Sequence, residues 1–161
     1  MRDAQPGDFG LTSIPGGVGF LIRLGQWLNG DGFKNYEHAF IYMYNGKILE
    51  AMPGGAIVSD ASKYASVRVS TVPLAIEQRK DIIDYAAALK GVPYSFLDYF
   101  AIAAKRFHLP VPFLTARVVK SKHMICSQIV DYVYSMAGVH LFTDDRLPSL
   151  VTPGQLIPFT E

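Results

Sequence analysis

The feature that most constrains the fold is the pair Asn45-Gly46, which stands between two runs rich in β-forming residues. Asn-Gly favours the positive φ angles of a two-residue hairpin turn and so predicts a β-hairpin. A plain two-residue turn pairs Ile41 with Glu50 and places His38 on the other face of the sheet from Glu50. One inserted residue, in a longer loop or a bulge, would return both side chains to one face.

The other sequence patterns predict an α+β domain. Apolar and polar residues alternate over 67–72, as in a half-buried strand, and 8–11 is expected to form a short opening strand. Helices are expected over 18–28, 74–90, 94–107 and 121–137, a proline-containing loop over 109–119, and a turn or single helical turn over 151–156. The core side of these helices is expected to include Ile76, Ile83, Ala86, Ala87, Ile125, Ile129, Val133 and either Met136 or Ala137. Because no linker or repeat divides the chain, we expect a single domain over 1–161.

Composition excludes several classes of protein. Half of the 161 residues are hydrophobic, which argues against disorder, and a formal net charge of +1 argues against a nucleic-acid-binding protein. The sequence shows neither an export signal nor an apolar run that could cross a bilayer. We therefore expect a soluble protein that is cytoplasmic at synthesis. Release by lysis, or transport in a phage or bacterial particle, would be its route out of the cell.

The chain has one cysteine, Cys126, at the polar entry to the apolar helical segment. A single cysteine rules out an internal disulfide and a cysteine-rich zinc site. Near a helix N-terminus, free backbone amides favour the reactive thiolate and can donate hydrogen bonds to an oxyanion. The alternative is a buried cysteine that only fills space, since free cysteine is among the most buried residue types.

His38 and Glu50 complete a candidate triad. A thiol nucleophile needs a nearby base, and histidine is the usual one near neutral pH. A carboxylate bonded to the far ring nitrogen would set the tautomer of the imidazole and stabilise its charged form. His123 is the rival base, three residues before Cys126, and Glu37 is the rival carboxylate, although it is expected to point away from its neighbour His38.

The hairpin resembles that of a known family. Its run from His38 through Ile-Tyr and a Gly-containing turn to Glu50-Ala51 is similar to the histidine hairpin of the NlpC superfamily of papain-like thiol hydrolases. The order His38, Glu50, Cys126 resembles the circularly permuted branch, the YiiX-like and lecithin:retinol acyltransferase-like proteins. Further similar segments, in the same order, are Gly7-Asp8-Phe9, Gly54 to Ile57, Gly91-Val92-Pro93-Tyr94, Ile125 to Val130 and Thr152 to Leu156.

The sequence also departs from that branch. Ser95 stands where an acidic residue often follows the tyrosine, and Gln128 stands where glutamate is common. The insert at 109–119 has no counterpart, and the Asn-Cys-Glu-His-Phe signature of the lecithin:retinol acyltransferases is absent from the sequence. The last departure makes acyl transfer a weaker expectation than hydrolysis.

The resemblance implies a permuted papain-like fold in which an antiparallel sheet or half-barrel packs on helices, with the nucleophile at a helix N-terminus. It implies hydrolysis of an amide, peptide or acyl (thio)ester bond through an acyl-thioester, with Cys126 as nucleophile, His38 as base and Glu50 as orienting residue. Tyr94 and Asp8 are expected to shape the substrate pocket. The expected substrate is a small peptide, a cell-wall peptide or an acyl compound, with no cofactor and no metal ion.

Two alternatives stay open at this stage. The aromatic and apolar segment 97–114 favours a non-catalytic module that docks into a larger assembly, such as a phage particle. Acyl transfer to an amine or an alcohol would differ from hydrolysis only in the acceptor, which the sequence does not reveal. One fold can host several functions.

Overall fold

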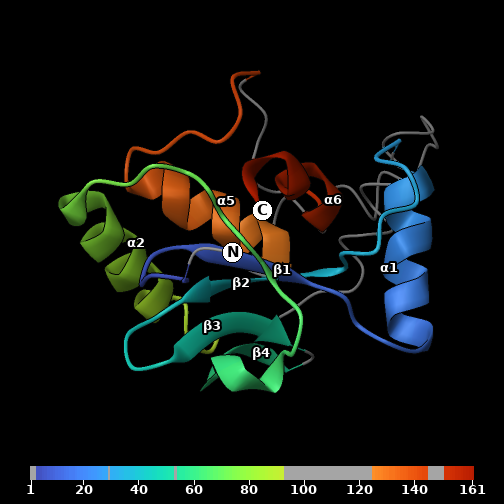
Figure 1. Cartoon of the computed structure of the whole chain (residues 1–161), viewed down its shortest axis with the longest axis horizontal. Coiled ribbons are helices and arrows are strands. Elements are labelled where there is room, and N and C mark those ends of the chain that lie inside the picture. Colours follow the sequence, from blue (N-terminus) through green and yellow to red (C-terminus); the bar gives the residue numbers. More distant parts are fainter. Residues whose placement is uncertain (1–2, 29, 53, 93–124, 145–150) are drawn as a thin grey trace.

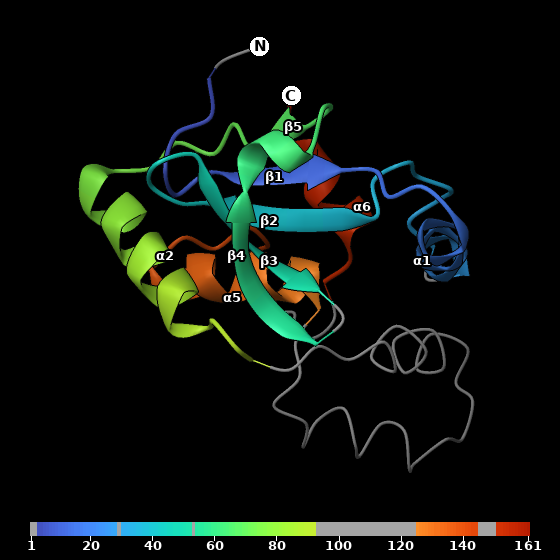
Figure 2. The ribbon, with the colours of Figure 1, turned by 90° about the horizontal axis from the view of Figure 1, so that it is seen from below.

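An open, antiparallel, five-stranded sheet forms the centre of the molecule (Figures 1 and 2). The computed structural model describes residues 3–28, 30–52, 54–92, 125–144 and 151–161. Its strands lie in the order β4-β3-β2-β1-β5. The strands are β1 (Phe9–Thr12), β2 (His38–Tyr42), β3 (Lys47–Met52), β4 (Gly55–Asp60) and β5 (Arg68–Val69). The predicted α+β class with an antiparallel sheet is thereby confirmed.

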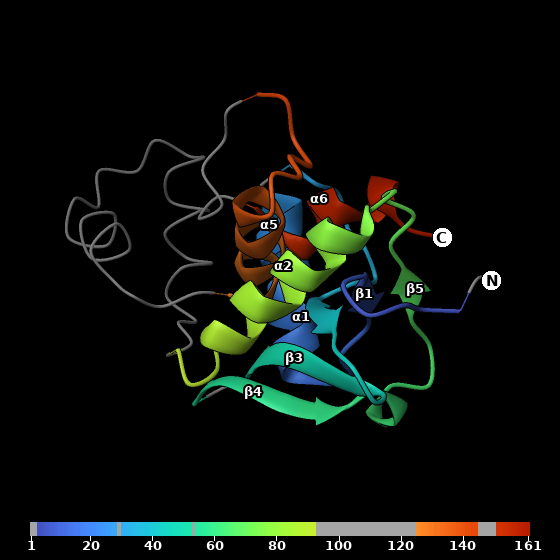
Figure 3. The same cartoon turned by 90° about the vertical axis from the view of Figure 1, so that its left-hand side faces the viewer.

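Helices α2 and α5 pack against each other on one face of this sheet, and both contact β2 (Figure 3). Helix α1 lies apart from them, beyond one end of the central strands (Figures 1 and 2). The helices are α1 (Gly17–Leu28), α2 (Ile76–Ala88), α5 (Cys126–Met136) and the single turn α6 (Pro153–Leu156), with 3-10 turns η1 (Ala61–Lys63) and η3 (Ile157–Phe159). Among the residues that the structure describes, no helix has the length and apolar character needed to cross a membrane.

The hairpin between β2 and β3 contains a bulge. Asn45 and Gly46 both have positive φ, at 59° and 66°, and Lys47 N donates to Tyr44 O at 3.2 Å, so these residues form the expected two-residue turn. Met43 N also donates to Lys47 O, at 2.8 Å. Met43 and Tyr44, which directly follow β2, therefore both lie opposite Lys47, the first residue of β3.

The bulge shifts the register by one residue. Glu50 faces Phe40, and Leu49 faces Ile41. The pairing of Ile41 with Glu50 that a plain turn predicts is therefore wrong, and the alternative with one inserted residue is confirmed. Since His38 and Phe40 are two residues apart on one strand, His38 shares a sheet face with Glu50.

The core lies between the sheet and helices α2 and α5. Ile129 and Val133 of α5 are buried as the helical spacing predicts, whereas Met136 is 47% exposed and the adjacent Ala137 takes the core position. Ala87 is exposed, contrary to its predicted core position. Ile76 is 82% exposed, also contrary to prediction. It is the first residue of α2, because the preceding Ala75 is extended (ψ 160°), so it lies at the helix end rather than along the buried face.

One further strand and the start of one helix differ from the predictions. Strand β4 was not predicted; it is an edge strand whose Ile57 and Val58 are both about two-fifths exposed (42% and 41%), so its sequence lacks a clear alternation. The helix expected over 121–137 begins at Cys126, because Ile125 is extended (φ −87°, ψ 165°). The segments 94–107 and 109–119 lie outside the described residues.

Candidate active site

The register of the hairpin brings His38 and Glu50 into contact. The distance from His38 Nε2 to Glu50 Oε2 is 2.9 Å, and both residues are buried, with 2% and 1% of their surfaces exposed. They are diagonal neighbours across β2 and β3, because Phe40 lies directly opposite Glu50. With Nε2 bound to the carboxylate, Nδ1 is the ring nitrogen left for a second partner.

Cys126 is that second partner of His38. A side-chain hydrogen bond joins the two residues, and Cys126 Sγ also lies 3.9 Å from the backbone oxygen of Glu37, to which it donates. Because Glu37 immediately precedes His38, this contact places the start of α5 against the start of β2. The structure thus brings together the three residues singled out from the sequence.

The local sequence explains why Cys126 stands at the helix N-terminus. The backbone of Ile125 is extended, and its N–H donates to Gln128 Oε1 at 3.0 Å, which ties the entry of α5 to its first turn. Cys126 is therefore the first helical residue. The first-turn amides and the helix dipole at this end favour negative charge. A thiolate at Cys126 has that favourable placement.

The environment of His38 favours its charged form. Burial alone lowers the pKa of His38, but hydrogen bonds with Cys126 and Glu50, and the charges of the same two groups, raise it to about 9. An imidazole of that basicity holds a proton at neutral pH. The site is therefore suited to an imidazolium that faces a thiolate on one side and a carboxylate on the other.

Glu50 accepts hydrogen bonds from three further side chains besides His38. Tyr64 OH donates to Oε2 and Lys63 Nζ donates to Oε1, each at 2.6 Å, and Ser59 on β4 is also a partner. Although burial raises the pKa of Glu50, the bonds from His38, Lys63, Ser59 and Tyr64 hold it well below the usual range of a glutamate. Glu50 is consequently an ionised group in a buried position.

Tyr64 also fixes the site through its ring. Its ring stacks on Phe40, with centroids 5.3 Å apart and planes 9° apart, and lies 5.7 Å from the ring of His38. Burial, together with the hydrogen bond to Glu50, raises the pKa of Tyr64, so its hydroxyl stays protonated and acts as a donor. The aromatic stack covers the face of the sheet that carries His38 and Glu50.

Sequence reasoning missed both Lys63 and Tyr64. They follow β4, at the end of and just after the 3-10 turn η1. Without β4 in the prediction, nothing indicated that the chain returns from Asp60 to the side chain of Glu50. The signal that could have found them is the separation of 13 and 14 residues from Glu50, typical of a second hairpin.

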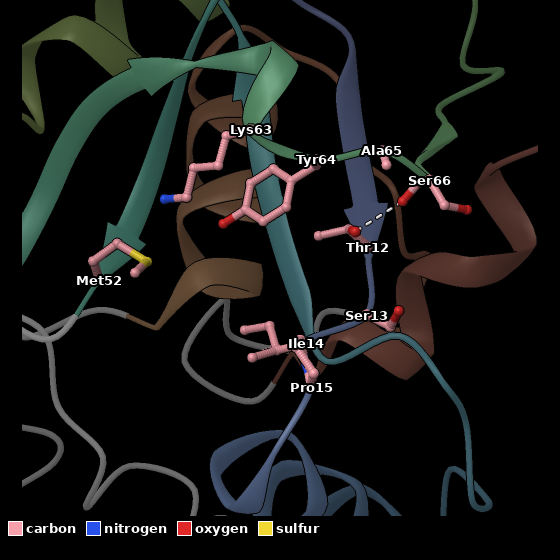
Figure 4. A pocket seen from close by; sticks show the side chains of 9 residues that line it. All are labelled: Thr12, Ser13, Ile14, Pro15, Met52, Lys63, Tyr64, Ala65 and Ser66. Atoms are coloured by element: carbon pink, nitrogen blue, oxygen red, sulfur yellow. Dashed lines mark hydrogen bonds between the residues drawn. The ribbon is translucent and has the colours of Figure 1, made fainter.

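A pocket of about 480 Å³ borders this site (Figure 4). Two of its lining residues, Lys63 and Tyr64, contact Glu50, and a third, Thr12, pairs with His38 across β1 and β2. Thr12 Oγ1 donates to Ser66 O at 2.8 Å and so closes one wall (Figure 4). The lining consists of Thr12, Ser13, Ile14, Pro15, Met52, Lys63, Tyr64, Ala65 and Ser66.

The remaining predicted site residues lie elsewhere. Asp8 precedes β1 at the end opposite Thr12, the residue paired with His38, and forms an ion pair of 3.0 Å with Arg79. The structure does not bring Asp8 to the triad. Tyr94 and the rival base His123 lie outside the described residues.

The rival carboxylate, Glu37, contacts other groups. Its Oε2 accepts from Ile14 N at 2.8 Å, and its Oε1 lies 3.0 Å from Arg23 Nε on α1. These contacts orient it away from His38, as expected for adjacent residues of an extended segment. Glu50 is therefore the carboxylate that His38 contacts.

Comparison with known proteins bears on the fold. A scan of protein-family models finds no match to this sequence, and a search of curated proteins also finds no match. Among solved structures, metalloprotein YiiX from Escherichia coli O157:H7 superposes with a TM-score of 0.61 over 91% of this chain and 78% of its own. The chain shares its fold with YiiX. The identity to YiiX is 18%, so the likeness concerns the fold alone. YiiX belongs to the papain-like fold family that the hairpin resembles.

Proposed function

We propose that this chain is a cysteine-dependent hydrolase that cleaves an amide, peptide or acyl (thio)ester bond through an acyl-thioester. The observation that carries the proposal is the buried chain of contacts from Cys126 through His38 to Glu50. Its parts come from separate elements, α5, β2 and β3, which the sheet register and the helix start bring to one place. The YiiX-like, papain-like fold supports the proposal at the level of architecture.

The proposed reaction begins with proton transfer from Cys126 to His38. The thiolate attacks the substrate carbonyl, and amides at the start of α5 donate to the oxyanion that forms. His38 returns the proton to the leaving amine, alcohol or thiol, which leaves an acyl-thioester on Cys126. Water, deprotonated by His38, then attacks the thioester and releases the acid and the free thiol. Glu50 holds the imidazole in orientation throughout.

The proposed substrate is a small peptide, a cell-wall peptide or an acyl compound. The pocket beside Glu50 offers about 480 Å³ and a mixed lining of hydroxyl-bearing and apolar side chains. It lies next to the strand that begins with His38, since Thr12 is both a lining residue and the sheet partner of His38. We assign it as the place where one end of the substrate binds.

YiiX is described as a metalloprotein. In the part of this chain that the structure describes, no three or more His, Cys, Asp and Glu side chains are grouped so that they could hold a metal ion. The docking alternative rests on the segment 97–114, which lies outside the described residues, and transfer to another acceptor stays a prediction from the sequence.

A panel of chromogenic amide, peptide, ester and thioester substrates tests the proposal. Wild-type protein should release product from at least one class, and Cys126→Ala should abolish the release while leaving thermal stability close to that of the wild type. Electrospray mass spectrometry of a quenched reaction should show the acyl adduct on Cys126. Equal turnover by the wild type and Cys126→Ala would reject the mechanism.

A further inference from the structure

The charges of the three triad residues do not balance. Once Cys126 has given its proton to His38, the site holds two anions, the thiolate and the Glu50 carboxylate, and one imidazolium. Burying an unbalanced charge is costly unless a counter-charge or hydrogen bonds stabilise it. The groups facing Glu50 are His38 from β2, Ser59 from β4, and Lys63 and Tyr64 from the segment after β4.

Lys63 is the cation among those groups besides His38. Its Nζ lies 2.6 Å from Glu50 Oε1, while His38 and Tyr64 share Oε2. Oε2 therefore contacts the imidazole of His38, and Oε1 contacts the ammonium of Lys63. The Glu50 side chain has no exposed surface and that of Lys63 is 38% exposed, so the ammonium reaches in from the pocket wall.

Lys47 forms an ion pair at the surface that can be compared with the Lys63–Glu50 pair. Lys47 Nζ also lies 2.6 Å from a carboxylate, Asp60 Oδ1, but the two side chains are 46% and 66% exposed. Water screens such a surface pair, which contributes little to stability. The Lys63–Glu50 pair has the same length with a fully buried carboxylate, where screening is weaker and the charge acts more strongly on its neighbours.

We propose that Lys63 is a positioning residue of the active site: its ammonium is the second cation that keeps Glu50 ionised, competes with His38 for that carboxylate, and balances the thiolate of Cys126. This inference rests on the proposed function for its catalytic meaning. Tyr64 assists as an uncharged donor to the oxygen that also binds His38. Without Lys63, the imidazolium would be the one cation among the groups that face Glu50, and the proton of His38 would be held more tightly.

The charge of Lys63 affects the acidity of both His38 and Cys126. A carboxylate shared with Lys63 attracts the imidazolium less strongly, so His38 stays acidic enough to protonate a leaving group. The same positive charge stabilises the nearby thiolate through the field of the site. Removing the lysine charge should therefore raise both the pKa of His38 and the pH at which the Cys126 thiolate forms.

The test compares variants at two positions. Lys63→Met removes charge and donor, Lys63→Gln keeps a donor without charge, and Lys63→Arg keeps both. Lys47→Met is the matched control, because it removes a lysine from a surface pair of equal length. Two measurements are made on each folded variant: the His38 titration by NMR and the pH profile of Cys126 alkylation by iodoacetamide.

We expect Lys63→Met and Lys63→Gln to raise the pKa of His38 and to shift the acid limb of alkylation upward by about half a pH unit, which is about a threefold lower rate on that limb. Lys63→Arg and Lys47→Met should follow the wild type. The inference is overturned if Lys63→Met leaves both profiles unchanged, or if Lys63→Gln restores them, since the charge would then have no part.

The two measurements also separate this inference from the proposed function. If His38 shifts in Lys63→Met but Cys126 is no more reactive than a free thiol, the Lys63 inference holds and the hydrolase proposal fails. If Cys126 is reactive and His38 does not shift, the proposed function holds and the Lys63 inference is overturned.

Discussion

Phe40, rather than Ile41, faces Glu50 across the β2–β3 hairpin. The difference of one residue arises at Met43, where the chain bulges between the end of β2 and the Asn45-Gly46 turn. In the plain register, His38 and Glu50 would lie on opposite faces of the sheet and could not be in contact. The 2.9 Å contact between them therefore depends on a bulge that begins five residues after His38.

Removing the bulge should separate His38 from Glu50. Deletion of Met43 would favour the plain hairpin, and the resulting shift would force either the core residues of β3 or Glu50 onto the wrong face. We expect lower stability in urea unfolding and loss of the enhanced reactivity of Cys126. Met43→Ala is the control: it keeps the bulge, so reactivity should stay near that of the wild type, with a loss of about 1 kcal/mol for the shortened side chain. Equal reactivity in the deletion variant would contradict this role of the bulge.

Glu50→Gln should weaken the site without abolishing it. The amide retains the shape of the side chain but loses the charge that raises the pKa of His38. We expect that pKa to fall by about one unit, so the pH at which His38 loses its proton should fall by the same amount. NMR titration of His38 measures this fall directly. An unchanged pKa of His38 in Glu50→Gln would show that the carboxylate does not control the imidazole.

The stability of the protein should decrease from about pH 6.5 to about pH 9. The folded-state pKa of His38 is raised from 6.5 to about 9, so folding favours the protonated form. The contribution of His38 protonation to the free energy of unfolding is complete below the unfolded-state pKa, and it is lost as the pH rises through the folded-state pKa. The loss is at most about 3 kcal/mol, because each pKa unit corresponds to about 1.4 kcal/mol. Urea unfolding at both pH values measures it, and His38→Gln should lack this component. A wild-type stability that rises across this interval while that of His38→Gln does not would contradict the assignment.

Tyr64 should act through two separable contacts. Tyr64→Phe removes the hydroxyl that donates to Glu50 but keeps the stack on Phe40, so we expect a loss of about 1 kcal/mol. Tyr64→Ala also removes the stack and should cost at least about 1 kcal/mol more. Thermal and urea unfolding of the two variants measure the difference. Equal stability of Tyr64→Phe and Tyr64→Ala would show that the stack contributes nothing.

Local patterns predicted much of this fold because they reflect local physics. The turn at Asn45-Gly46 follows from backbone preferences, and the burial of Ile129 and Val133 follows from helical spacing. The place of Cys126 at a helix head was also predicted, although α5 begins five residues later than expected, at Cys126 itself. The extended backbone of Ile125 sets that start, and its sequence carries no cap-forming side chain to reveal it.

The parts that the sequence did not reveal depend on long-range placement. Strand β4 lies at the sheet edge with Ile57 exposed, so it lacks the alternation by which strands are recognised. Lys63 and Tyr64 reach Glu50 only because β4 returns the chain along β3. Asp8 was expected at the pocket, yet its ion pair with Arg79 holds it at the other end of β1.

The most direct test of the triad uses the single cysteine of the chain, because every thiol reagent has one target. The rate of iodoacetamide alkylation at Cys126 is measured at pH 6 against a free-thiol peptide, with His38→Ala as the matched variant. A thiolate held by His38 stays ionised at a pH where an ordinary thiol is almost wholly protonated, so we predict a rate at least about tenfold above that of the peptide, lost in His38→Ala. A rate at or below that of the peptide, or one unchanged in His38→Ala, would contradict the account.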